Sequence, residues 1–173
     1  DFFGVAHEEI LKLFPQIDLE LWRIPAEQLS IEQHGAFDFI FSIHVLEHMH
    51  EPDKALFAMR KVLNPNGHML HLCPIYSVPY EPHFSLLLIP IKPEWTKYIL
   101  PKKISNHPRW KSINFLTYSQ IKKWASDCNL TIRFDPDIML YFFNRLDEDP
   151  MFSKRHKRFI ALTWRFIKKT GLR

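Results

Sequence analysis

Residues 37–74 read FDFIFSIHVLEHMHEPDKALFAMRKVLNPNGHMLHLCP, and this stretch decides the fold. It opens with an almost unbroken apolar run, Phe37 to Ile43, whose aromatic and β-branched residues predict a parallel strand covered on both faces. Pro52 suits the first position of a helix, and the apolar side chains that follow recur on one stripe, so this helix is expected to pack onto a sheet. The stripe consists of Ala55, Leu56, Met59, Val62 and Leu63.

Turn residues from Asn64 to Gly67 are expected to end this helix, and the alternating run from His68 to Cys73 predicts the next strand before Pro74. Strand, helix and strand in so short a stretch form one right-handed βαβ crossover. The two strands are therefore predicted to be adjacent and parallel, with the first of them central in its sheet.

The composition sets the class of protein. The chain has 173 residues with 46% hydrophobic content, which is enough for a single core and indicates one domain. Its two cysteines, Cys73 and Cys128, argue against a disulfide framework and favour a reducing compartment. No apolar run reaches the length of a membrane span, and the first residues lack the order of a signal peptide. We therefore expect a cytoplasmic protein.

The segment from Pro74 to Pro108 differs in composition from the rest of the chain, since it holds seven of the thirteen prolines together with many aromatic residues. Proline at this density interrupts regular structure, while the aromatic side chains require burial, so a packed insert of short helices is expected. After it, Thr117 to Gln120 is a capping-box candidate that begins a helix with a clear apolar stripe. Leu130 to Phe134 alternates like a strand, and Ile138 to Phe143 fits either a strand or a buried helix.

The C-terminal segment, residues 153–173, carries eight basic residues and no acid. An apolar stripe runs through it, as in helices that lie on anionic membranes, but a helix docked on its own domain fits equally. The overall charge of +4 is modest and no nucleic-acid module is visible, so no nucleic-acid partner is expected. The stripe consists of Phe159, Ile160, Thr163, Trp164 and Ile167.

Several of these motifs, taken in order, resemble the second half of the class I S-adenosylmethionine-dependent methyltransferases, and most closely the methyltransferase type 11, or ubiquinone-type, branch. The resemblance covers residues 2–74 well and the remainder loosely. It implies an α/β fold, with a Rossmann-like, mostly parallel sheet flanked by helices, and S-adenosylmethionine as cofactor. The motifs are Phe37-Asp38, Val45-Leu46-Glu47-His48, Pro52, Ala55-Leu56, Val62-Leu63-Asn64-Pro65-Asn66-Gly67 and Pro74.

The resemblance also implies a division of the chain. Phe2 to Val5 would be the second strand of the sheet and Leu19 to Ile24 the next, with the first strand and the glycine-rich loop upstream of residue 1. We expect four parts: a partial cofactor-binding core in 1–75, a lid or acceptor insert in 76–116, the C-terminal part of the sheet in 117–150, and a basic amphipathic tail helix in 151–173.

Methyl transfer is an in-line displacement that depends on alignment and desolvation. Open parallel sheets bind ligands at the carboxyl ends of their strands, so Ser42, Ile43 and His44 should border the methionine and sulfonium part of the cofactor. By the resemblance, the adenine would lie against Ile24, Ala26 and Glu27. Acids that usually bind the nucleoside are replaced by Ala6 and Pro25.

Histidine titrates near neutral pH, so His44, His48 and His83 are the candidate bases for the acceptor. If the insert forms a lid over the acceptor, then Tyr76, Tyr80 and His83 are its substrate-side residues. The acceptor is expected to be a small molecule, a lipid-linked compound or a glycan. Residues 153–173 could hold the enzyme at an anionic surface, which would place it at the inner face of a membrane.

Two other functions remain open. Ala6 and Pro25 also fit a methyltransferase-like domain that binds or scaffolds without catalysis. The letters H-x-x-E-H, formed by His44, Glu47 and His48, match the signature of a zinc hydrolase, but that site needs one continuous helix. Here the motif follows an apolar strand directly and Pro52 comes soon after, so zinc hydrolysis is a remote alternative and no metal is expected.

Overall fold

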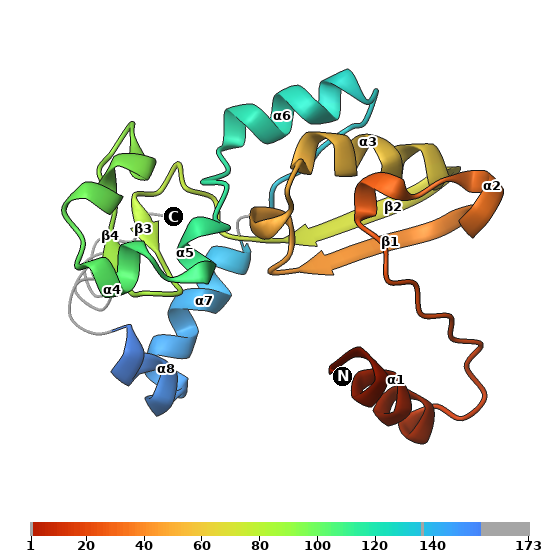
Figure 1. Ribbon diagram of the computed structural model, residues 1–173, viewed down its shortest axis with the longest axis horizontal. Helices are drawn as coiled ribbons and strands as arrows, with labels where there is room; N and C mark the ends of the chain where they lie inside the picture. Colours follow the sequence, from red (N-terminus) through yellow and green to blue (C-terminus); the bar gives the residue numbers. More distant parts are fainter. Residues whose placement is uncertain (1, 136, 157–173) are drawn as a thin grey trace.

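The computed structural model describes residues 2–135 and 137–156 (Figure 1). Strands β1 (Phe37–Ile43) and β2 (Leu63–Leu72) pair in parallel, with Ile40 opposite Met69 and Ile43 opposite Leu72. Helix α3 (Pro52–Val62) connects them and has a proline in its first turn. The βαβ crossover and the adjacent parallel strands are therefore confirmed. The second strand begins earlier than expected, because residues 63–67 join it across an irregularity in the register near Phe37.

The core lies on one face of this parallel pair. Helix α3 and helix α6 (Tyr118–Asp127) cover that face in Figure 1. Ile40 and Met69 pack from the strands against the buried cluster. The mixed α/β class with helices on a parallel sheet is thus confirmed, and burial of its apolar side chains is the dominant stabilising term. The cluster consists of Leu46, Ala55, Leu56, Met59, Leu116 and Ile121.

The opposite face of the sheet is apolar and exposed. Phe39, Phe41, Ile43 and Leu70 are each more than half exposed to solvent, and the rings of Phe39 and Phe41 stack at 6.1 Å. Among the described residues the sheet has only these two strands. The prediction that Phe37 to Ile43 is a central strand covered on both faces is therefore wrong for this part of the chain, since no described segment pairs with its other edge.

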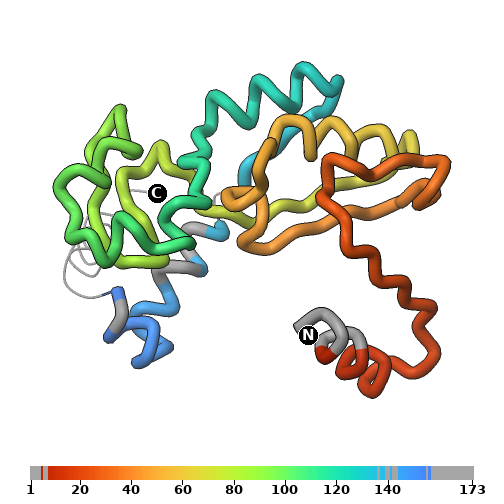
Figure 2. Tube along the Cα trace, in the orientation of Figure 1, coloured from red at the N-terminus to blue at the C-terminus, as the bar shows by residue number. Residues whose placement is uncertain are grey.

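Three other predicted strands are absent from the described residues. Phe2 to Val5 belongs to helix α1 (Phe2–Leu13), which an extended stretch joins to helix α2 (Ile31–His34) in Figure 2. Leu19 to Ile24 and Leu130 to Phe134 have no regular structure. A strand needs a partner strand, and no strand among the described residues pairs with these segments.

The proline-rich insert has the short elements expected of it and a core of its own. Its hairpin of β3 (Tyr80–Glu81) and β4 (Leu86–Leu87) precedes a 3-10 helix η3 (Pro93–Tyr98) and helices α4 (Lys102–Ser105) and α5 (Pro108–Lys111). Figure 1 places this insert beyond the arrowheads of β1 and β2, which is the carboxyl end of the sheet. Its buried cluster consists of Tyr76, Leu88, Trp110 and Ile113.

The C-terminal part of the described chain is helical. Thr117 caps α6 with both hydrogen bonds of the predicted capping box, and the apolar stripe of α6 is buried at Ile121 and Ala125. The sequence left open whether Ile138 to Phe143 forms a strand or a helix, and the structure places it in helix α7 (Asp137–Glu148). Helix α8 (Pro150–Arg155) follows. Most of the predicted basic tail lies outside the described residues. Within the described part of the chain, every helix is too short or too polar to cross a membrane.

Candidate functional site

The candidate site begins where β1 ends. His44 follows the strand with a φ of 54°, and its amide donates to the Leu72 carbonyl at 2.7 Å. A positive φ is uncommon outside glycine and is found often at functional sites. After this residue the chain turns into the 3-10 helix η2 (Leu46–His48), whose Leu46 is 2% exposed in the core. Ser42, Ile43 and His44 therefore lie at the carboxyl end of the sheet, as the sequence predicted, and their cofactor role stays a prediction.

Glu47 is the most unusual side chain of the site. It is fully buried, and neither carboxylate oxygen has a hydrogen-bond partner among the described residues. Its Oε1 lies 3.7 Å from Nδ1 of His44 and 4.0 Å from Nε2 of His48. The Asn114 amide donates to the Glu47 carbonyl at 2.8 Å, so the insert holds this segment in place.

The structure brings the three predicted histidines together from two parts of the chain, the segment after β1 and the insert. The His83 ring lies 6.5 Å from that of His44 and 5.2 Å from that of His48, centroid to centroid. Burial lowers the pKa of His48, while the Glu47 carboxylate opposes that shift. A neutral imidazole at pH 7 can accept a proton or bind a metal. The catalytic role of the three histidines stays a prediction.

Sequence reasoning did not identify the groups that orient these rings. Oε1 of Glu81, a fully buried residue, lies 2.6 Å from Nδ1 of His83, and Oγ of Ser112 lies 2.8 Å from Nδ1 of His48. Both partners belong to the insert. Glu81 is two residues before His83, but only the fold of the hairpin shows that its carboxylate turns back toward the ring.

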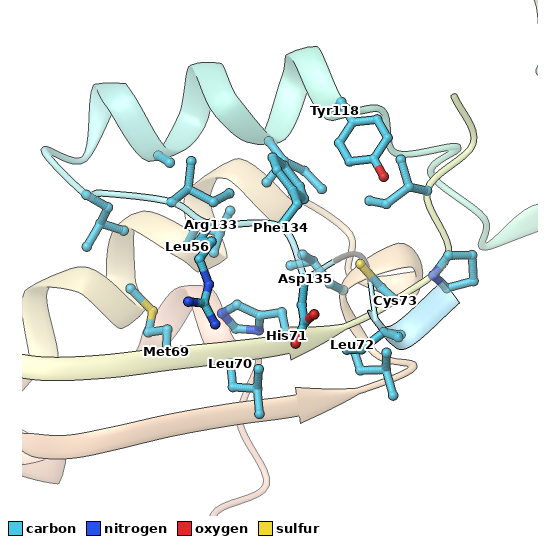
Figure 3. A pocket seen from close by; sticks show the side chains of 18 of the residues that line it. Leu56, Met69, Leu70, His71, Leu72, Cys73, Tyr118, Arg133, Phe134 and Asp135 are labelled. Carbon is cyan, nitrogen blue, oxygen red and sulfur yellow. The ribbon is translucent and has the colours of Figure 1, made fainter. Parts of the chain in front are cut away.

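A cavity of about 470 Å³ lies between β2, α6 and residues 130–135, and extends to His44 and Tyr80. Its walls are mainly apolar. Figure 3 shows His71 pointing from β2 into this space toward Arg133 and Asp135, whereas Leu70 points to the other face.

His71 is the chief polar group of β2 in this cavity. Its Nδ1 lies 2.8 Å from Oγ of Ser42 across the sheet, and its Nε2 is buried without a hydrogen-bond partner among the described residues. Burial lowers the pKa of His71, so the ring is held neutral. Sequence reasoning did not identify this residue, because alternation alone does not show that a polar side chain faces a cavity.

The other predicted site residues have varied positions. Ile24 is 36% exposed, Ala26 packs against the main core, and Glu27 accepts a hydrogen bond from the Glu51 amide at 3.1 Å. Ala26 and Glu27 lie on the 3-10 helix η1 (Ala26–Gln28), which packs on α3. Tyr80 lines the cavity, and its hydroxyl lies 2.8 Å from Nδ1 of His156.

Two further side chains near the site, those of Tyr76 and Cys73, do not have the properties of catalytic groups. The Tyr76 side chain is buried in the core of the insert and its hydroxyl donates to Oε1 of Glu81 at 3.4 Å. Burial raises the pKa of the Cys73 thiol to about 12, with a further contribution from the Glu47 charge. A thiol with this pKa is protonated at neutral pH, which argues against nucleophilic catalysis by Cys73.

Comparison with known proteins gives matches over most of the chain. Residues 6–133 match a family model described as a methyltransferase domain. Two uncharacterized proteins of Mycobacterium tuberculosis strains are each 33% identical over 133 residues, which is 72% of this chain and 45% of the relative.

Two named enzymes are more distant relatives. The ubiquinone biosynthesis O-methyltransferase of Dechloromonas aromatica is 26% identical over 127 residues, or 73% of this chain and 50% of the relative. The protein of the same name in Alkalilimnicola ehrlichii is 25% identical over 118 residues, or 68% of this chain and 44% of the relative. This chain thus spans about half the length of the curated relatives it matches. No solved structure matches it.

Proposed function

This chain belongs to the methyltransferase-domain family, and from that premise we propose that it takes part in methyl transfer from S-adenosylmethionine to a small, largely apolar acceptor. The observation that carries the proposal is the carboxyl end of the parallel pair. There β1 ends, His44 has a positive φ, and its ring lies 6.5 Å from that of His83 in the insert. Ligands of open parallel sheets bind at this edge.

In this proposal the methionine and sulfonium part of the donor lies against Ser42, Ile43 and His44, and the adenine near Ile24 and Ala26. The acceptor atom attacks the methyl carbon as the carbon–sulfur bond breaks, and the bonding pair leaves with sulfur to give S-adenosylhomocysteine. The acceptor proton passes to a histidine, for which His44 at the end of β1 is the candidate. The protein supplies alignment and exclusion of water.

The cavity supports an apolar acceptor, because it adjoins His44 and its walls are mainly apolar. Apolar sites with a few polar groups are usual for small ligands. The names of the distant relatives favour an oxygen as the atom that is methylated. Residues 153–173, with their eight basic side chains, extend the proposal to an acceptor that is lipid-linked or membrane-borne.

A methyltransferase-like domain that binds without catalysis is the second candidate. One structural observation favours it: the Glu27 carboxylate is engaged by the Glu51 amide at the start of α3 instead of lying free for a ligand. Ala6 and Pro25 also offer no carboxylate for a nucleoside.

Transfer of labelled methyl groups separates the two functions. The protein is incubated with methyl-tritiated S-adenosylmethionine and a series of phenols with alkyl chains of increasing length. We expect label in the organic extract, increasing with chain length and reduced at least tenfold in His44→Ala, while His50→Ala retains it. His50 is an exposed histidine that does not line the cavity, so it controls for loss of a histidine elsewhere. Binding of S-adenosylhomocysteine without any transfer across the series would favour the non-catalytic domain.

A further inference from the structure

The starting point is the burial of Glu47. A carboxylate removed from water without a hydrogen-bond donor is strongly unfavourable, and buried charges in proteins are usually paired or bind metals. Both oxygens of Glu47 lack a hydrogen-bond partner among the described residues, and the residue is fully buried. The imidazoles of His44 and His48 lie 3.7 and 4.0 Å from its Oε1, too far for a hydrogen bond, and a cation held between the carboxylate and an imidazole would balance its charge.

The hydrogen bonds of His48 determine which of its nitrogens faces this carboxylate with a lone pair. The Ser112 hydroxyl lies 3.0 Å from the Arg109 carbonyl, to which it can donate its single proton, and 2.8 Å from Nδ1 of His48. In the tautomer that satisfies both contacts, the hydroxyl donates to the carbonyl and accepts from Nδ1, which carries the hydrogen. In the neutral ring Nε2 is left with a lone pair, and this nitrogen lies 4.0 Å from Oε1 of Glu47. A lone pair facing a carboxylate oxygen calls for a cation between them.

The His83 ring is also oriented through its Nδ1, in this case by the buried carboxylate of Glu81. Oε1 of Glu81 lies 2.6 Å from Nδ1 of His83, and the Glu81 carboxylate also accepts from the amides of His83 and Phe84. This arrangement fixes the ring and directs its other nitrogen, Nε2, away from Glu81. Histidines that bind metals are commonly oriented by a carboxylate on the remote nitrogen.

We propose that Glu47, His48 and His83 bind one divalent transition-metal ion through two imidazoles and one carboxylate. One ligand atom from each residue lies within 4.8 Å of the others, so small side-chain movements would bring all three into coordination. Three protein ligands leave at least one coordination position open, as in catalytic zinc sites. Imidazole suits zinc, whereas Mg²⁺ prefers oxygen ligands. The site goes beyond the proposed methyl transfer, which needs no metal.

This ligand set differs from the zinc hydrolase alternative. That alternative paired His44 with His48 on one helix, but His44 precedes η2 and is not part of it. The structure supplies the second imidazole from the insert instead, 35 residues further along the chain than His48.

Metal binding can be measured without any enzymatic activity. The full chain is stripped with a chelator, dialysed and titrated with Zn²⁺ in a calorimeter. We expect one zinc per chain, no comparable binding of Mg²⁺, and loss of the site in Glu47→Gln, His48→Ala and His83→Ala. His68→Ala, at an exposed position on β2, should bind zinc like the unaltered protein. Equal zinc binding by His83→Ala and His68→Ala would overturn the proposal, as would the absence of stoichiometric binding.

Thermal unfolding distinguishes a ligand role from a structural one. Since Gln removes a buried charge that accepts no hydrogen bond, Glu47→Gln should unfold at a higher temperature than the metal-free protein and gain nothing from added zinc. Glu81→Gln should keep the stoichiometry but bind zinc about 10- to 100-fold more weakly, because it orients His83 without touching the ion. If Glu47→Gln destabilised the metal-free chain and still gained stability from zinc, Glu47 would not be a ligand.

Discussion

The amide of His44 donates to the carbonyl of Leu72 at 2.7 Å, one residue beyond the end of β1. This hydrogen bond extends the parallel register to the point where both strands stop. It holds His44 at the edge of the sheet, while Cys73 and Pro74 lead from β2 into the insert that carries His83. The fold and the candidate site thus share one contact, and changes to the packing of β1 on β2 should alter both.

The first prediction concerns the core beneath the sheet. Leu56 is 6% exposed in the main cluster, whereas its neighbour Phe57 is 50% exposed. Leu56→Ala should lower the free energy of unfolding by about 2–5 kcal/mol, because it leaves a cavity in the core. Phe57→Ala should change it by only about 0.5 kcal/mol. Urea unfolding followed by circular dichroism measures both, and similar losses would show that α3 presents a different face to the sheet.

The elements that the sequence predicted correctly are those whose partners lie close along the chain. Phe37 to Ile43 and the alternating residues that follow α3 pair across one short crossover, so local pattern and neighbour agree. Phe2 to Val5 and Leu130 to Phe134 have strand-like composition, yet a strand depends on a distant neighbour that residue type does not reveal. These two strand predictions were wrong and the prediction of β1 was correct for the same reason, because a strand forms only where a partner strand is available.

For the candidate site, residue chemistry selected the three histidines but not their partners. His44, His48 and His83 stood out because imidazole titrates near neutral pH. The burial of Glu47 and the contact of Glu81 with His83 arise from the fold of the insert, which proline-rich sequence does not specify in detail.

The second prediction concerns the start of α6. The Thr117 hydroxyl accepts from the Gln120 amide, and the Gln120 side chain accepts from the Thr117 amide at 2.9 Å. Thr117→Ala should cost about 1 kcal/mol of unfolding free energy, since it leaves a helix-terminal amide unsatisfied. Ser126→Ala, at an exposed position near the end of the same helix, is the matched control and should have little effect. Equal losses in the two variants would argue against the capping box.

The third prediction is a dependence of stability on pH. Burial lowers the pKa of His71 from its ordinary value of 6.5, so below that pH the unfolded state binds a proton that the folded state does not. The free energy of unfolding should therefore rise with pH across the range below and around 6.5, and fall on acidification. Arg133 and Asp135 line the same cavity, and the lowered pKa of His48 adds a change of the same sign.

Comparison of two variants isolates the contribution of His71. His71→Asn should flatten the dependence, because the buried titrating ring is gone while a polar group remains opposite Ser42. His68→Asn, in the same strand but exposed, should leave the dependence unchanged. Unfolding free energies at pH 5.0 to 7.5 provide the test, and a profile of His71→Asn that coincides with that of His68→Asn would refute the assignment.

The fourth prediction concerns affinity for the methyl donor. Ala6 and Pro25 stand where the resemblance leads us to expect acids for the nucleoside, so this chain should bind S-adenosylmethionine more weakly than micromolar. Pro25→Asp restores one acceptor at a position that precedes η1 and should tighten binding. Pro65→Asp, at an exposed position of β2, is the control and should not. Calorimetry that gave a micromolar constant for the unaltered chain would contradict this prediction.

The central claim is that the donor binds at the carboxyl end of β1, and weak binding makes nuclear magnetic resonance the direct test. The amide spectrum of the nitrogen-labelled chain is followed while S-adenosylhomocysteine is added to millimolar concentration. The account predicts progressive shifts at Ser42 to His44 and at Ala26 and Glu27, with little change at the exposed residues of α6. A spectrum without shifts at residues 42–44, or with shifts confined to other elements, would contradict it.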